Sequence, residues 1–208
     1  FSPSPDIFLT QGKKYFVKLK KIFPKKIIKQ IGSLKLGIQN IKTKKSNDVK
    51  RKLIKDSRKI ISIFTSTHDY LGMTEILNNS NLSNYFLILR PHPYYRFKTI
   101  NHFKKDTKFK FHLLDDLSPR EIISISDFVL SGDSSLCYEA AILGKKNTLR
   151  LYNEKFHPLF DLEDGITIVK DSKSLDKYLN KKIKIKNLSP KSLIKKFFFK
   201  YDKKAHIR

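Results

Sequence analysis

The chain has 208 residues, of which 39% are hydrophobic and 30% charged, and this balance excludes a collagen-like, mucin-like or wholly disordered protein. No apolar run approaches the roughly 18 residues that a membrane-spanning helix needs, because lysine or aspartate interrupts each one. The one cysteine, Cys137, excludes an internal disulfide scaffold and a multi-thiolate zinc site, so we expect a reducing compartment.

The formal net charge of +25 is unevenly distributed along the chain. Residues 1–60 hold 18 basic and 3 acidic side chains, residues 171–208 hold 13 and 3, and residues 61–170 hold 13 of each. Lysine outnumbers arginine 37 to 7, as A/T-rich codons would encode, so the basic flanks reflect either genome composition or a functional basic face. Nucleic-acid sites favour arginine and no nucleic-acid-binding motif is present, so we expect no nucleic-acid partner.

The first 58 residues predict the end of a preceding domain followed by a linker. A short apolar run at 6–9 precedes a helix expected over 13–22 and a strand expected over 27–31. The Lys- and Asn-rich stretch 40–58 has no apolar period, which is typical of a linker or a solvated helix. Because the chain opens with phenylalanine inside what resembles an ongoing fold, we expect it to be a fragment.

From residue 59 onward, strand-like and helix-like segments alternate. Apolar runs predict strands over 60–65, 85–89, 109–114, 127–130, 147–152 and 166–169. Helices are expected over 70–79, from Ser118 onward, from Ser134 or Ser135 to Leu143, over 173–180 and over 190–201. This alternation predicts an α/β fold with a doubly wound parallel sheet, comprising a domain over 59–182 and a basic C-terminal helix or tail over 183–208.

Ligands of such sheets bind beyond the carboxyl ends of the strands, which directs attention to three loops. They are Ser66–Asp69, Arg90–Pro93 and Ser131–Ser135. The third combines a glycine, two serine hydroxyls and a helix N-terminus, which together suit a phosphate group, whereas ordinary N-capping would explain one serine alone. Glu139 lies one helical turn beyond Ser135 and is either an acceptor for ribose hydroxyls or a surface carboxylate.

His92 lies between two prolines, so its backbone is stiff on both sides. Its imidazole could donate a hydrogen bond to a phosphate or a leaving group. The alternative is a structural turn at the strand end, and the second His-Pro dipeptide, at His157, shows that the dipeptide alone is a weak signal. The histidines lack metal-ligand spacing, so no metal is expected.

Together these residues resemble the C-terminal half of GT-B glycosyltransferases that build bacterial surface polysaccharide. The resemblance rests on the order of these segments: Arg90-Pro91-His92-Pro93, Ile125 to Leu130, Gly132-Asp133-Ser134-Ser135, Glu139-Ala140-Ala141 and Gly144-Lys145-Lys146. The most similar group carries a His-Pro and a Ser-Ser motif and includes sialyl-, polysialyl-, Kdo- and CDP-glycerol-type transferases. Pro5 to Ser33 resembles the end of their first domain, and Phe199 to Ala205 their C-terminal tail.

The resemblance implies a Rossmann-like domain that binds a nucleotide sugar as substrate. No separate cofactor or metal is expected, because backbone dipoles and His92 can stabilise the developing charge. His92 and Pro93 with Ser134 and Ser135 would contact a cytidine nucleotide and its phosphate, and Arg90, Gly132, Asp133 and Glu139 complete the expected donor site. The catalytic base usually lies in the first domain, so no base is assigned to this chain.

The expected reaction moves a sugar or a glycerol-phosphate-like group from a CMP- or CDP-linked donor to a growing glycan. That acceptor could be lipid-linked, which implies a cytoplasmic enzyme held peripherally on the inner, anionic face of the membrane. Two alternatives stay open: a UDP-GlcNAc 2-epimerase-like enzyme of the same fold, which usually has Gly-Gly in place of Ser134-Ser135, and a non-catalytic basic binding protein.

Overall fold

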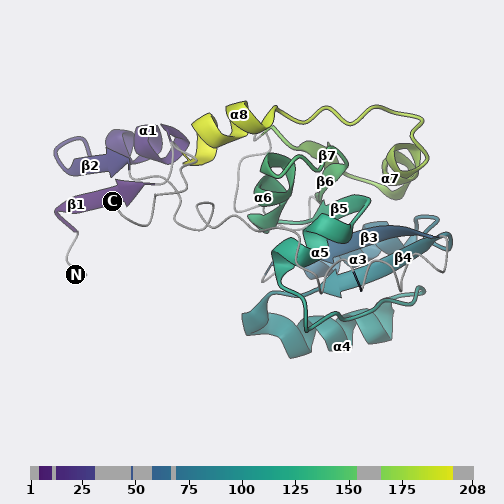
Figure 1. Ribbon diagram of the computed structural model, residues 1–208. Coiled ribbons are helices and arrows are strands. Elements are labelled where there is room, and N and C mark those ends of the chain that lie inside the picture. Colours follow the sequence, from purple (N-terminus) through teal and green to yellow (C-terminus); the bar gives the residue numbers. More distant parts are fainter. Residues whose placement is uncertain are drawn as a thin grey trace. The chain divides into compact units, whose positions relative to one another are not determined.

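The computed structural model describes residues 5–10, 13–30, 48, 58–66, 69–153 and 165–198 (Figure 1). The chain divides into two compact units, one made of residues 1–40 with 188–208 and the other of residues 41–187. The expected linker over 40–58 falls almost entirely outside the described residues. Within the described ranges, no helix is long and apolar enough to cross a membrane.

The larger unit is built on a five-stranded, wholly parallel sheet in the order β4-β3-β5-β6-β7. Its strands are β3 (Lys59–Phe64), β4 (Tyr85–Arg90), β5 (Phe128–Ser131), β6 (Thr148–Leu151) and β7 (Thr167–Val169). Each lies on an apolar run that the sequence predicts as a strand, and the residues of β5 and β6 are entirely buried. The expected parallel α/β sheet is therefore confirmed.

Helices cover both faces of this sheet. On one face Ile61, Ile63 and their neighbours pack against α3 (Tyr70–Asn78), α4 (Arg96–Asp106) and α7 (Ser172–Leu179). On the other face Ile60, Phe64 and their neighbours pack against α5 (Pro119–Ile125) and α6 (Leu136–Ile142). The alternation along β3 sends successive side chains into two separate hydrophobic cores, which makes the sheet doubly wound as expected.

The strand expected over residues 109–114 does not form along its whole length, but this segment lies next to β4 and pairs with it at one residue. Only His112 bridges to the sheet, pairing in parallel with Ile88 on the outer edge of β4. His112 N–H donates to the Leu87 carbonyl (2.8 Å), and Leu89 N–H donates to the His112 carbonyl (2.9 Å). Counting this bridge as a sixth position gives the order 3-2-1-4-5-6 of dinucleotide-binding Rossmann folds.

The helix that precedes this bridge was not predicted from the sequence. A 3₁₀ turn, η2 (Pro93–Tyr95), follows β4 and leads directly into α4. Only Thr99, Ile100 and Phe103 of α4 are buried, and apart from the exposed Phe97 its other residues are polar. An apolar stripe this narrow gives little periodic signal.

Two helix ends in this unit follow their sequence signals closely. Ser118 and Glu121 form a reciprocal capping box at the start of α5, with Pro119 at the first helical position. Gly144 follows α6 with φ +84°, the left-handed conformation that favours glycine after a helix. Lys145 then donates to the carbonyls of Ser124 (2.7 Å) and Ser126 (2.9 Å) at the end of α5.

The smaller unit contains two parallel strands, β1 (Ile7–Thr10) and β2 (Ile27–Gln30), joined through α1 (Lys13–Ile22). The expected helix and strand are thus present. Phe8 stacks on Phe23 with ring centroids 4.8 Å apart. The last described elements are α8 (Pro190–Leu193) and the π-helical turn η3 (Ile194–Phe198), in which Phe197 is buried and Lys14 lies over its ring.

Candidate functional site

The three loops singled out in the sequence begin at the same edge of the sheet, because the strands that precede them end in register. Phe64, the last residue of β3, is in register with Arg90 at the end of β4 and with Ser131 at the end of β5. Because β4 and β5 lie on opposite sides of β3, the connections diverge at β3 and β5. In open α/β sheets, ligands bind outside the carboxyl ends of the strands at such a switch point.

Asp69 joins the β3 loop to the β5 loop at this point. Its Oδ1 accepts the Ser66 N–H (2.8 Å) and its Oδ2 accepts the Asp133 N–H (2.7 Å). Burial raises the pKa of Asp69 from 3.8 to about 6, although these two backbone hydrogen bonds oppose the shift. The carboxyl group therefore fixes the position of the Ser131–Ser135 loop relative to β3.

Gly132 is required by this arrangement. A Cβ atom placed on Gly132 would lie 2.0 Å from Asp69 Oδ2 and 2.6 Å from Asp69 Cβ. Any side chain at position 132 would thus displace the Asp69 carboxyl group. Gly132, expected only as part of a phosphate-binding turn, therefore also has a packing function.

His92 is exposed and its ring is oriented by the chain itself. It is the N-cap of η2, and its Nδ1 accepts the Tyr94 N–H at 3.3 Å. An accepting Nδ1 leaves the proton of the neutral ring on Nε2, so Nε2–H is a hydrogen-bond donor toward solvent. The stiff turn expected from the two prolines is present, and it fixes the tautomer as well.

Arg90, next to this turn, belongs to a small charged cluster. Asp115 receives Arg90 Nη1 at 3.5 Å on one carboxylate oxygen and Arg96 on the other. Both arginine side chains are partly buried, while the aspartate is exposed. The cluster leaves an excess of positive charge at the carboxyl end of β4.

Ser134 and Ser135 lie at the start of α6, as expected. The Oγ of Ser134 accepts the Leu136 N–H at 3.3 Å. Ser135 is the exposed N-cap residue, and its side chain makes no capping hydrogen bond. Ser134 thus hydrogen-bonds a backbone N–H at the start of the helix, whereas the Ser135 hydroxyl accepts no N–H of the helix. Asp133 is partly exposed beside them.

Glu139 is more enclosed than a surface carboxylate. It is 7% exposed, and its Oε2 accepts Arg120 Nε at 3.3 Å, which links α6 to α5. Arg120 leaves no local sequence signal as a partner of Glu139, because the pair joins two separate helices, α5 and α6. Asp69 was within a singled-out loop, and the Ser66-to-Asp69 spacing, typical of a side chain that accepts a nearby backbone N–H, is the signal that could have identified it.

Two histidines of the sequence analysis, His68 and His157, lie outside the described residues. His102 contacts Asp106 (2.7 Å) and Thr74 (3.1 Å), and His112 stacks on Phe86. In the described part of the chain, no three His, Cys, Asp or Glu side chains gather into a group that could hold a metal ion.

Neither a protein-family model nor a curated protein matches the sequence. Two solved structures of the wall teichoic acid polymerase TagF are similar in fold. One, a histidine-to-asparagine variant soaked with CDPG, is 16% identical with a TM-score of 0.52, and the match covers 96% of this chain and 54% of that one. The other is 18% identical with a TM-score of 0.56, over 96% and 55%.

This chain therefore spans about half the length of those structures. The fold is Rossmann-like and of the GT-B type. At these identities the likeness is one of fold, and it agrees with the Rossmann-like strand order described above.

Proposed function

We propose that this chain carries the donor-binding site of a glycosyltransferase. The donor is a CMP- or CDP-linked sugar or glycerol-phosphate-like group, and the acceptor is a growing bacterial surface glycan. The observation that carries the proposal is the meeting of the β3, β4 and β5 loops at the switch point of a Rossmann-like sheet.

In this proposal the donor phosphate lies against the loop before α6. The Ser135 hydroxyl is exposed there, and Ser134 lies beside it. Hydroxyl and backbone N–H donors of this kind bind phosphate oxygens. Gly132 and Asp133 belong to the same loop, and Asp69 holds its position.

His92 supplies a hydrogen bond to the departing phosphate. Its Nε2–H is directed outward by the Nδ1 contact to Tyr94 N–H, so a donor oxygen can approach without any change in the ring. Arg90 and Pro93 flank His92, and the positive charge of the Arg90 cluster stabilises the negative charge that develops on the leaving group. Such a preorganised donor accelerates a reaction by about 100-fold or more.

Glu139 is proposed to accept a hydroxyl of the ribose or of the transferred sugar. Its Oε2 is held by Arg120, so the ligand would approach the other carboxylate oxygen. This pair also fixes α6 against α5, so a substitution of Glu139 would change stability as well as binding.

The cytidine preference has two supports. The His-Pro and Ser-Ser segments resemble those of cytidine-dependent transferases, and one of the TagF structures of similar fold was soaked with CDPG. No observation favours the epimerase-like alternative.

Calorimetric titration of the chain with CMP, CDP, UDP and AMP tests the proposal. We expect CMP or CDP to bind more tightly than AMP, and Ser134→Ala with Ser135→Ala to remove most of the binding. The matched control is Ser172→Ala with Ser174→Ala, two serines in the first turn of α7 that belong to none of the three loops. Absence of cytidine nucleotide binding at millimolar concentration, or equal binding by the two double variants, contradicts the proposal, and binding of UDP alone supports the epimerase-like function.

We also propose that the basic flanks hold the enzyme on an anionic membrane surface at the inner face. In the smaller unit, α1 and α8 with η3 border a cavity of about 450 Å³ that is lined by Val17, Ser192 and the lysines 13, 14, 195 and 196. Each lysine near an anionic bilayer contributes about 1 kcal/mol. Cosedimentation with anionic vesicles that weakens as salt rises supports this attachment, and equal binding to neutral vesicles contradicts it.

A further inference from the structure

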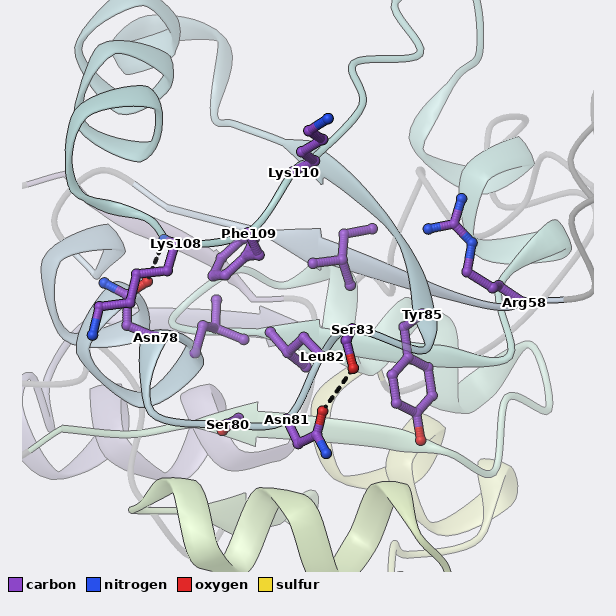
Figure 2. Close-up of a pocket in the computed structure, with 12 residues that line it drawn as sticks. Arg58, Asn78, Ser80, Asn81, Leu82, Ser83, Tyr85, Lys108, Phe109 and Lys110 are labelled. Carbon is purple, nitrogen blue, oxygen red and sulfur yellow. Dashed lines mark hydrogen bonds between the residues drawn. The ribbon is translucent and has the colours of Figure 1, made fainter.

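A second cavity, of about 400 Å³, lies at the opposite edge of the sheet, where β4 begins (Figure 2). The end of α3, the loop after it, the start of β4 and the segment after α4 form its walls. None of its lining residues belongs to the candidate donor site. Its volume lies within the range of roughly 300–1,000 Å³ that is usual for small-molecule sites.

The segment after α4 borders the cavity and is hydrogen-bonded to the end of α3. Asn78, at the end of α3, donates from Nδ2 to the Asp106 carbonyl and accepts the Lys108 N–H at Oδ1 (3.0 Å). This segment therefore joins the sheet only at His112 instead of pairing along the whole of β4. The strand expected over 109–114 fails to form at the place where the cavity opens.

The floor of the cavity is apolar and its walls are polar but uncharged. Leu77, Leu82 and Leu87 are buried beneath it, and Phe109 is partly buried at its side. Ser83 Oγ donates to Asn81 Oδ1 (2.9 Å), which leaves the Asn81 amide as a donor and the Ser83 oxygen as an acceptor.

The rim is positive. Figure 2 shows Arg58, Lys108 and Lys110 around the cavity, on different sides of it. Both lysines are exposed, and no acidic residue is among the lining residues. Neither ammonium group forms an ion pair with any residue that the structure describes. Arg58 lies over the Phe86 ring, 5.7 Å from its centroid.

We propose that this cavity binds a phosphorylated sugar or polyol. The ammonium groups of Lys108 and Lys110 attract the phosphate ester as compact point charges. Asn81 and Ser83 exchange hydrogen bonds with the hydroxyl groups, and the leucine floor with Phe109 contacts the carbon face of the ligand. The phosphate ester belongs either to a free sugar phosphate or to a phosphodiester-linked polymer. This inference does not depend on the proposed donor site.

The test is a calorimetric titration with glucose 1-phosphate at low ionic strength, with glucose as the uncharged control. We expect glucose 1-phosphate to bind and glucose to bind far more weakly. Lys108→Gln with Lys110→Gln should lower the affinity for glucose 1-phosphate by about tenfold, since each substitution removes one nearby unit charge. The matched control is Lys104→Gln with Lys105→Gln, which removes the same charge from the exposed last turn of α4 and should change the affinity less than about twofold.

The Ser134→Ala, Ser135→Ala variant separates this site from the donor site, because it should retain full affinity for glucose 1-phosphate. Stronger binding of a glycerol-phosphate oligomer than of glucose 1-phosphate indicates the polymer as the source, and equal binding indicates the free ester. The proposal is overturned if glucose 1-phosphate does not bind, or if the two double lysine variants lower its affinity equally. It is also overturned if only the Ser134→Ala, Ser135→Ala variant loses the binding of glucose 1-phosphate.

Discussion

The contact between Gly132 and Asp69 offers the sharpest stability prediction. Gly132→Ala introduces a Cβ atom 2.0 Å from Asp69 Oδ2, which is far shorter than any non-bonded contact between carbon and oxygen. The flanking backbone is enclosed, because Ser131 and Gly132 are both buried. The Asp69 carboxyl group must therefore move by at least about 1 Å to reach an ordinary contact.

That displacement breaks both backbone hydrogen bonds of the carboxyl group, which are 2.8 Å and 2.7 Å long. A hydrogen bond to a charged group contributes about 1.5–3 kcal/mol, so the expected loss in the free energy of unfolding is about 3 kcal/mol or more. Gly144→Ala is the control. Gly144 has no atom within 4 Å of its Cβ position, and only its left-handed φ of +84° opposes a side chain, at a cost of about 1 kcal/mol.

Urea denaturation followed by circular dichroism at pH 7.5 measures both losses. We expect the alanine at position 132 to be more destabilising than the alanine at position 144, although the latter position is the one with the unfavourable backbone angle. If the Gly132 variant loses no more stability than the Gly144 variant, the Asp69 carboxyl group does not hold the β5 loop in the way described.

Three further predictions follow from the same contacts. The pKa of Asp69 is about 6 in the folded chain and 3.8 ordinarily, so between these values the folded state binds a proton that the unfolded chain releases. The free energy of unfolding should therefore rise by about 1 kcal/mol from pH 7 to pH 5. Asp69→Asn should lack this rise, and a rise of equal size in that variant contradicts the assignment. In an enzyme that also contains the first domain, His92→Asn should lower donor turnover by about 100-fold with unchanged stability, because it retains a good N-cap acceptor for Tyr94 N–H but loses the Nε2 donor. A normal rate would leave His92 a structural turn residue. Lys145→Met should cost about 1–3 kcal/mol in urea denaturation, because it removes charged hydrogen bonds to the end of α5, while nucleotide affinity stays normal; a selective loss of affinity would instead place Lys145 in the site.

The sheet could be predicted from the sequence because its strands are fully buried. A strand covered on both faces is a continuous apolar run, and β3, β4, β5 and β6 all have that form. The start of α5 was equally clear, since Ser118, Pro119 and Glu121 each favour the same helix boundary.

The errors occurred where tertiary contacts override local pattern. Residues 109–114 alternate apolar and polar side chains as a strand does, yet Asn78 ties the residues just before them, Asp106 and Lys108, to the end of α3. The narrow buried stripe of α4 gave no period to detect.

The candidate site was predictable in its loops but not in the contacts between them. Strand ends could be located from composition, and the parallel order then brings them to one edge. The bond from Asp69 to Asp133 joins residues 64 positions apart, and the Arg120 to Glu139 pair joins two helices, so neither leaves a local pattern. These pairings depend on the strand order, which the residue pattern does not specify.

The most direct test of the central claim is where a cytidine nucleotide binds on the sheet. In an amide chemical-shift titration of the chain with CDP, the account predicts the largest shifts in residues 92–95 and 131–136, at the carboxyl edge, and smaller shifts that saturate at higher CDP concentration in residues 81–83 and 108–110 around the opposite cavity. Shifts confined to that opposite edge, or no shifts at saturating CDP, would contradict it.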